Sequence, residues 1–244
     1  MHSMSEYSHE FALYWPFTQQ LCGKNLYVID DQDLYHRMVR VVRLQPGALC
    51  VLFNNKVHAR IAITEITKKT VSCTICTYQE HRYLQPAVRL ILPLLKRQAL
   101  EEALYTAVEL GVTTVQLVHT TKVHRSWQEK DATRLEHVMI AAAEQSKNYA
   151  FPVIYSVKSL QECLNDLSLN SDKIVFDISG ESFFEIHKQM ICKHKYIIIG
   201  PEGGLTIQEL SMIKEHGFIA CSLTPTVLRA LQAAAVGAAL FRIS

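Results

Sequence analysis

The chain has 244 residues, of which 49% are hydrophobic and 20% are charged, and its formal net charge is +2. This composition supplies enough apolar residues for one large core or two smaller ones, and it argues against a disordered chain or a repeat array. A net charge this small does not by itself indicate a nucleic-acid partner.

The chain also lacks the usual marks of export, membrane insertion or metal binding. Met1 to Glu6 have neither the basic start nor the apolar core of a signal peptide, and no apolar segment approaches the roughly 20 residues that span a bilayer. We therefore expect a cytoplasmic protein whose seven cysteines are reduced core residues. Cys73 and Cys76 have metal-ligand spacing, but residues three apart on a strand point to opposite faces, so we expect no metal site.

The first part of the chain is predicted to be a small β-barrel domain. Strand-like runs separated by turn residues cover Leu49 to Asn54, Val57 to Ile66 and Thr70 to Tyr78. One helix is expected from about Asp31 to Val42. The polar stretch from Tyr78 to Pro86 predicts a linker, and this divides the chain into domains at residues 1–80 and 87–244.

After the linker, strand and helix patterns alternate, which indicates an α/β domain with a mostly parallel sheet. Strands are expected at Val88 to Leu94 and at Lys173 to Asp177, and a further strand follows Gly111 and ends at Val118. Apolar residues at helical spacing mark two helices, at Leu100, Ala103, Leu104, Ala107 and Val108 and at Leu135, Val138, Met139 and Ala142. A third helix begins at Ser159, where Glu162 completes a capping box.

The segment Ile199-Gly200-Pro201-Glu202-Gly203-Gly204 follows an apolar strand and leads into a helix that Thr206 and Glu209 cap and Gly217 ends. Glycines permit positive φ angles and close approach of a ligand to the backbone. The segment is neither a Rossmann fingerprint nor a phosphate-binding P-loop. It is either a small-molecule site or only a tight strand-to-helix connection.

Near the C-terminus, Ser222-Leu223-Thr224-Pro225-Thr226-Val227-Leu228-Arg229 precedes an alanine-rich helix from about Ala230 to Phe241. Together with the glycine segment, this pattern resembles the SPOUT class of knotted methyltransferases. Within that class the sequence resembles the ribosomal small subunit methyltransferase E family, which methylates N3 of a uridine in 16S rRNA. Further matching segments are His36 to Leu44, Glu109 to Val112 and Ala142 to Ser146.

The resemblance implies a C-terminal α/β trefoil-knot domain, an N-terminal PUA-like domain that binds RNA, and a homodimer acting on 16S rRNA or the small ribosomal subunit. It implies S-adenosyl-L-methionine as the cofactor, held by Phe176, Ile199, Gly200, Pro201, Glu202, Gly203, Gly204, Leu223, Thr224, Val227 and Leu228, with Asp177 close by. The small residues of the last helix, Ala233, Ala234, Gly237 and Ala238, suit either the dimer contact or packing on the helix's own sheet.

Arg229 is the expected catalytic residue, because a fixed cation beside the base would stabilise a developing uridine anion. A phosphate contact or an ion pair across the dimer is an open alternative. The expected RNA-binding residues are basic side chains of the N-terminal domain, which otherwise form a solvated face: Arg37, Arg40, Arg43, Lys56 and Arg60, with Lys68 and Lys69 nearby.

The chain also departs from the family pattern. Leu231 stands where the family has a glutamate, Thr106 where it commonly has a lysine, and Thr120-Thr121 where it has Glu-Arg. These departures leave two alternatives: a relative that binds rRNA or cofactor with weak or no methyl transfer, or an enzyme that methylates another RNA position.

Overall fold

A computed structural model describes residues 10–168 and 170–243 of the chain. The N-terminal residues that argue against a signal peptide lie outside this range. The chain forms two compact units, one comprising the described residues up to Arg82 together with Glu144–Ala150, the other comprising Tyr83–Ala143 and the described residues from Phe151 onward. None of the helices in the described part of the chain is long and apolar enough to cross a membrane.

The first unit is built on a five-stranded sheet with the order β1-β3-β4-β5-β2. Its strands are β1 (Phe11–Tyr14), β2 (Leu26–Ile29), β3 (Leu49–Phe53), β4 (Val57–Ile66) and β5 (Val71–Glu80). The last three are the predicted strands. Strand β1 pairs in parallel with β3, and the other pairings are antiparallel. On β5, Cys73 is buried and Cys76 is exposed, so the two thiols occupy opposite faces as expected for a strand.

The predicted helix near residue 31 is present in two parts. Helix α1 (Gln32–Tyr35) begins at Asp31, whose Oδ1 accepts a hydrogen bond from the Leu34 amide at 2.9 Å. The chain continues as a π-helix over His36–Val41, followed by Arg43 at a φ of 61°. The wider turn of the π-helix changes which side chains share a face, so Arg37 and Arg40, three residues apart, are not placed as they would be on an α-helix.

Residues Glu144–Ala150 pack with the first unit, although they follow it by some sixty positions in the sequence. The Glu144 carboxylate forms an ion pair with Arg37 and accepts a hydrogen bond from the Tyr14 amide at 2.7 Å. The Tyr149 ring lies 4.8 Å from the Phe53 ring and 5.0 Å from the His58 ring, centroid to centroid. The Ala142 to Ser146 motif therefore supplies an anchoring residue of the N-terminal unit.

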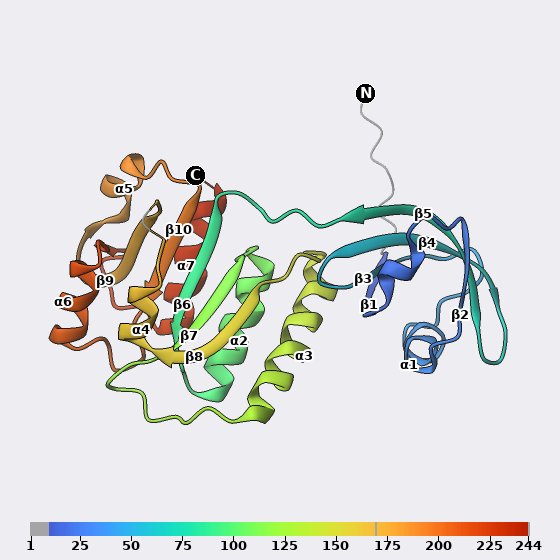
Figure 1. Cartoon of the computed structure of the whole chain (residues 1–244), viewed down its shortest axis with the longest axis horizontal. Helices are drawn as coiled ribbons and strands as arrows, with labels where there is room; N and C mark the ends of the chain where they lie inside the picture. Colours follow the sequence, from blue (N-terminus) through green and yellow to red (C-terminus); the bar gives the residue numbers. More distant parts are fainter. Residues whose placement is uncertain (1–9, 169, 244) are drawn as a thin grey trace. The chain divides into compact units, whose positions relative to one another are not determined.

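The second unit is built on a six-stranded sheet with the order β11-β9-β10-β6-β7-β8 (Figure 1). Its strands are β6 (Ala87–Pro93), β7 (Thr114–His119), β8 (Val153–Ser159), β9 (Asp172–Ser182), β10 (His194–Ile199) and β11 (Ile219–Ser222). Every pairing between these strands is parallel, which confirms the predicted α/β class.

Helices cover both faces of this sheet, as alternation along the strands requires. Leu90 and Leu92 of β6 point into a cluster with helices α2 (Arg97–Glu109) and α7 (Ala230–Ile243), whereas Ile91 points to the opposite cluster. The first layer also contains α3 (Glu129–Ser146) and α5 (Phe183–Ile186), and the second contains α4 (Leu160–Asn165) and α6 (Ile207–Glu215).

Arg242, in the last turn of α7, connects three distant carbonyl groups. Its guanidinium donates to the carbonyls of Leu110, Gly111 and Pro86 at 2.7, 2.6 and 2.8 Å. Gly111 has a φ of 64°, a conformation that favours glycine. The Glu109 to Val112 motif is thus a helix end whose exposed carbonyls are satisfied by the C-terminal helix.

Candidate active site

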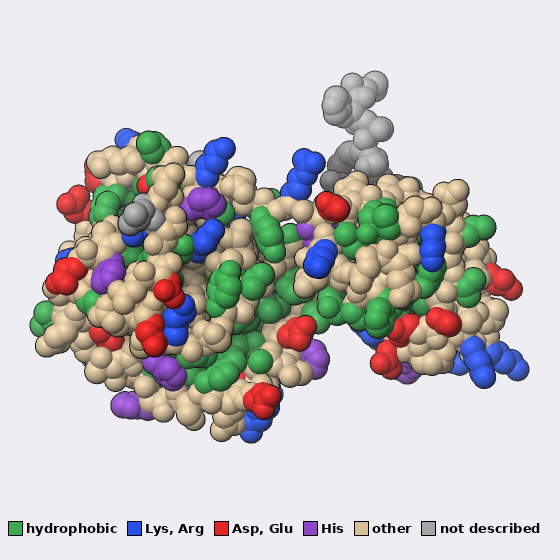
Figure 2. Space-filling model, in the orientation of Figure 1, with side chains coloured by type: hydrophobic (Ala, Val, Ile, Leu, Met, Phe, Trp, Pro, Cys, Tyr) green, Lys and Arg blue, Asp and Glu red, His purple; other side chains and the backbone are tan. Residues whose placement is uncertain are grey.

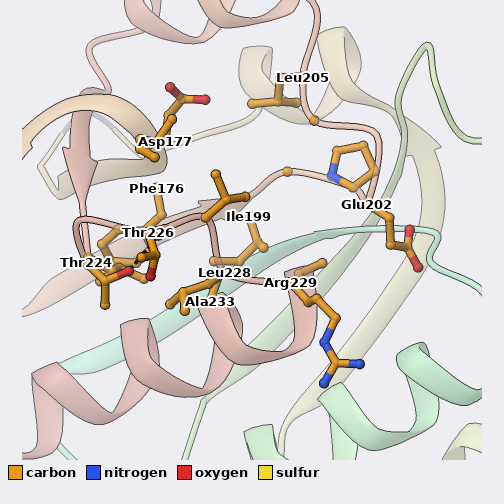
Figure 3. Close-up of a pocket in the computed structure, with 17 residues that line it drawn as sticks. Phe176, Asp177, Ile199, Glu202, Leu205, Thr224, Thr226, Leu228, Arg229 and Ala233 are labelled. Carbon is orange, nitrogen blue, oxygen red and sulfur yellow. Dashed lines mark hydrogen bonds between the residues drawn. The ribbon is translucent and has the colours of Figure 1, made fainter.

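A cavity of about 330 Å³ opens at the carboxyl edge of the parallel sheet, beside the middle of β9 and the carboxyl ends of β10 and β11 (Figure 3). This edge is where open parallel sheets commonly bind ligands. Its wall consists of Phe176, Asp177, Ile178, Ile199, Gly200, Pro201, Glu202, Gly204, Leu205, Leu223, Thr224, Thr226, Val227, Leu228, Arg229, Ala230 and Ala233. Three segments far apart in the sequence therefore form one site.

The first wall is a break in the ladder between β9 and β11. The ladder passes from the pair Val175 and Ala220 directly to the pair Glu181 and Cys221, so the intervening residues of β9 leave the register. Asp177 lies in this bulge, and its Oδ1 accepts hydrogen bonds from the amide and hydroxyl of Ser179 at 2.9 and 2.6 Å. A carboxylate is thereby fixed beside the cavity.

The second wall is the glycine segment after β10. Of its three glycines, Gly204 has a positive φ, 70°, and its amide donates to the Pro201 carbonyl at 2.8 Å to close the turn. The predicted capping box at the start of α6 is present: Thr206 caps the helix and Glu209 reaches back to the Thr206 amide. The predicted sequence of strand, turn and capped helix is confirmed.

The glycine segment is held in place by the loop that follows β7. Buried Glu209 accepts hydrogen bonds from the amide and hydroxyl of Thr121 at 2.7 and 3.1 Å. Burial raises the pKa of Glu209, but hydrogen bonds from the Thr206 and Thr121 amides and hydroxyls outweigh it, so the pKa is lower than usual. Lys122 Nζ donates to the Gly203 carbonyl at 2.6 Å. Thr121, one of the departures from the family pattern, thus has a structural role here.

The third wall is the segment before α7 and the first turns of that helix. Thr224 Oγ1 donates to the Thr226 carbonyl at 2.7 Å, which bends the segment around the cavity. Deeper along α7, Gly237 faces the Phe176 ring so closely that an added Cβ would lie 2.3 Å from its Cε2. The absence of a side chain at Gly237 therefore allows α7 to pack against Phe176 within the second unit.

All but one of the cofactor-binding residues expected from the sequence line this cavity. The exception is Gly203, which contacts the Lys122 side chain instead. Asp177, expected nearby, also lines it. Sequence reasoning missed Ile178, Leu205, Ala230 and Ala233 as lining residues; the last three adjoin or follow quoted motifs, so proximity was the available signal.

Arg229 lies between this cavity and a second one. The second cavity has a volume of about 300 Å³ and is lined by Lys96, Gln98, Ala99, Glu102, Glu202, Arg229, Ala230 and Leu231. Glu202, Arg229 and Ala230 belong to both. In Figure 3 the charged ends of Glu202 and Arg229 lie on one side of the site, away from Phe176, Thr224 and Thr226. Leu231, which replaces the family's glutamate, lines only the second cavity.

Within the part of the chain that the structure describes, the basic residues expected to bind RNA divide into a group with ion-pair partners and a group without them. Arg37 pairs with Glu144 and Arg60 with Glu10, so both side chains already have partners within the protein. Arg40, Arg43 and Lys56 are exposed. Figure 2 shows side chains of both signs interspersed over the visible face, in keeping with the small net charge. Within the described residues, no group of three or more His, Cys, Asp or Glu side chains is arranged to hold a metal ion.

The parallel sheet, the ligand-sized cavity at its carboxyl edge and the glycine turn agree with the SPOUT type of fold, and the family models show that the chain is an RNA methyltransferase. Residues 83–242 match the RNA methyltransferase domain and residues 29–76 match the RNA methyltransferase PUA domain. The chain belongs to the RNA methyltransferase family described by these two domains.

Relatives confirm the resemblance predicted from the sequence. Proteins named ribosomal RNA small subunit methyltransferase E from Rickettsia conorii and Bacillus subtilis are each 27% identical to this chain, over 85% and 86% of its length and 86% and 87% of theirs. The crystal structure of the Neisseria gonorrhoeae protein of that name, bound to S-adenosyl methionine, is 24% identical and has a TM-score of 0.83, covering 96% of this chain and 98% of that one. This likeness confirms the fold.

Proposed function

We propose that this protein transfers a methyl group from S-adenosyl-L-methionine to N3 of a uridine in 16S rRNA of the small ribosomal subunit. The observation that carries the proposal is the cavity at the carboxyl edge of β9, β10 and β11, formed by the residues that the family resemblance assigns to the cofactor. The names of the relatives supply the substrate class, and the Neisseria relative is bound to the same cofactor.

The residues present suit S-adenosyl-L-methionine chemically. Phe176, Ile199 and Leu228 offer apolar surface for the adenine ring, and the turn around Gly204 brings backbone groups to the cavity without a bulky side chain. Asp177, held by Ser179, offers a carboxylate to the positively charged part of the cofactor. When bound, the cofactor supplies an activated methyl group and its own leaving group.

The protein's own contribution is positioning and charge stabilisation. N3 of uridine carries a proton that must leave before the nitrogen can accept a methyl group. Arg229 cannot act as a base near neutral pH because its guanidinium stays protonated, but it can stabilise the negative charge that develops on the base. Its place between the two cavities suits this role. We propose Arg229 as the catalytic residue.

The test combines binding and turnover. Calorimetric titration with S-adenosylhomocysteine should give micromolar or tighter affinity, and labelled methyl should be transferred to small subunits assembled from unmodified 16S rRNA. Methylation at N3 blocks base pairing, so a reverse-transcription stop locates the product. Arg229→Ala should lower kcat roughly a hundredfold with nearly unchanged cofactor affinity; lost affinity with normal turnover of bound cofactor would remove Arg229 from the catalytic role.

A second candidate function rests on Leu231. Without the family's glutamate, the protein would bind rRNA or cofactor with weak or no methyl transfer, or methylate another RNA position. Cofactor affinity without turnover on small subunits would support the binding protein. A product that maps to another base or a ribose hydroxyl would support the altered target.

For the remaining features we propose a cytoplasmic homodimer whose PUA-like domain contacts rRNA. Arg40, Arg43 and Lys56 are the exposed cations of this domain best suited to phosphate contacts, whereas Arg37 and Arg60 would first have to leave their carboxylate partners. Reversing Arg40 and Arg43 to Glu should weaken rRNA binding and flatten its salt dependence. Light scattering at micromolar concentration tests the dimer, and a monomer there would contradict it.

A further inference from the structure

The second cavity has the chemical character of a site for a flat heterocycle. Ala99, Ala230 and Leu231 provide apolar surface, against which the face of a base can lie. Around them stand two cations, Lys96 and Arg229, which can donate to carbonyl oxygens.

Helix α2 supplies the polar groups that the sequence motifs did not reveal. Lys96 immediately precedes the helix, Gln98 lies in its first turn, and Glu102 lies one turn further. Gln98 Nε2 donates to Glu102 Oε1 at 2.9 Å, which ties these two lining side chains together. Arg125 fixes the entry to this helix by donating to the Leu95 carbonyl at 3.1 Å.

The second cavity also adjoins the proposed cofactor cavity. It shares Glu202, Arg229 and Ala230 with the proposed cofactor cavity, so a molecule in one is adjacent to a molecule in the other. Methyl transfer requires that adjacency, since the two reacting atoms must meet in line.

We propose that the second cavity receives the base of the acceptor nucleotide, and that Lys96 determines its specificity for uracil. The inference rests on the proposed function, because it places the acceptor of that same reaction. Uracil presents two carbonyl oxygens on either side of N3–H, which match the two cations, and N3 between them stays open toward the cofactor cavity. Cytosine presents an amino group in place of one carbonyl, and a cation there repels it.

Three variants separate this proposal from general damage. Ala99 lines only the second cavity, so Ala99→Leu narrows that cavity and leaves the first unchanged. Lys96→Ala removes one cation from the second cavity. Arg97→Ala is the matched control, because Arg97 is the exposed neighbour of Lys96 and lines neither cavity. All three should keep wild-type affinity for S-adenosylhomocysteine. Lys96→Ala should lower kcat/KM for small subunits about tenfold, the usual effect of losing one hydrogen bond to a charged group, and Arg97→Ala should not.

The deciding experiment does not depend on turnover. Saturation-transfer NMR with uridine monophosphate, in the presence of S-adenosylhomocysteine, should give signals for the wild type and for Arg97→Ala. For both proteins the signals should be weaker with cytidine monophosphate. For Ala99→Leu the uridine signal should fall at least tenfold. Equal signals in Ala99→Leu and wild type, or no uridine signal in the wild type, would overturn the assignment of the cavity. Equal binding of both nucleotides would overturn the role in specificity. Absence of methyl transfer with uridine binding intact would instead refute the proposed function.

Discussion

Gly237→Ala should destabilise the protein, although the same change in a helix interior ordinarily stabilises it. Alanine is favoured over glycine by about 0.5–1 kcal/mol in a helix. Here the new Cβ would lie 2.3 Å from Phe176 Cε2 and 2.9 Å from its Cδ2, closer than nonbonded carbons allow. Phe176 is 8% exposed and packs against Phe183, so its ring has little room to retreat. Overpacking of this kind costs roughly 1–3 kcal/mol, so after the helix gain a net loss of about 1 kcal/mol, and at most about 2.5 kcal/mol, is expected.

The same clash should reach the cofactor, because Phe176 also lines the first cavity. Chemical denaturation measures the stability change, and calorimetric titration with S-adenosylhomocysteine measures the affinity, which should fall. The decisive control is the background Phe176→Leu, whose shorter side chain leaves space for the added methyl group. In that background Gly237→Ala should become neutral or stabilising. If Gly237→Ala stabilises the otherwise unchanged protein, or costs as much in the Phe176→Leu background, contact with Phe176 is not the cause.

Three further changes test the structural ties around the site. Arg242→Met should cost about 3 kcal/mol of unfolding free energy, since three carbonyl groups lose a charged donor; a cost below 1 kcal/mol in denaturant melts would refute the role of this residue. Glu209→Gln should loosen the glycine segment and remove part of the acid dependence of stability. Because the pKa of Glu209 is lowered on folding, its contribution is present above its unfolded pKa and lost as pH falls through the folded value, so wild type and variant should converge in acid melts. Glu144→Gln should destabilise the first unit, with hydrogen exchange rising around Tyr14 and Arg37 and little change near Phe176.

Much of the fold could be predicted because local signals agree with the tertiary structure. The capping boxes at Ser159 and Thr206 and the alternation in Val57–Ile66 are patterns that neighbours in sequence determine. Strands β1 and β2 have four residues each, too few for a period to be recognised. Strand β8 lies at the sheet edge with Val153 and Tyr155 exposed, so it lacks the apolar run that marks an interior strand.

The candidate site was only partly visible for the same reason. The glycine segment and Leu223 to Leu228 could be predicted because each carries its own turn chemistry and a family pattern. The contacts of Thr121 with Glu209 and of Lys122 with Gly203 join segments more than eighty residues apart, and no local pattern indicates that these segments meet. The ion pair of Glu144 with Arg37 joins residues that are still further apart in the sequence. The sequence identified the Ala142 to Ser146 motif but not its partner Arg37.

The replacement of the family's glutamate by Leu231 need not remove acidic groups from the site. The cavity that Leu231 lines also contains the carboxylates of Glu102 and Glu202, the second of which reaches the cofactor cavity as well. Leu231 instead enlarges the apolar surface beside Ala99 and Ala230, and that surface favours stacking of a base over binding of a phosphate. The substitution therefore changes how an acceptor would be held more than whether one can be held. Because methyl transfer requires a base held beside the cofactor cavity, this lining supports methyl transfer over RNA binding alone.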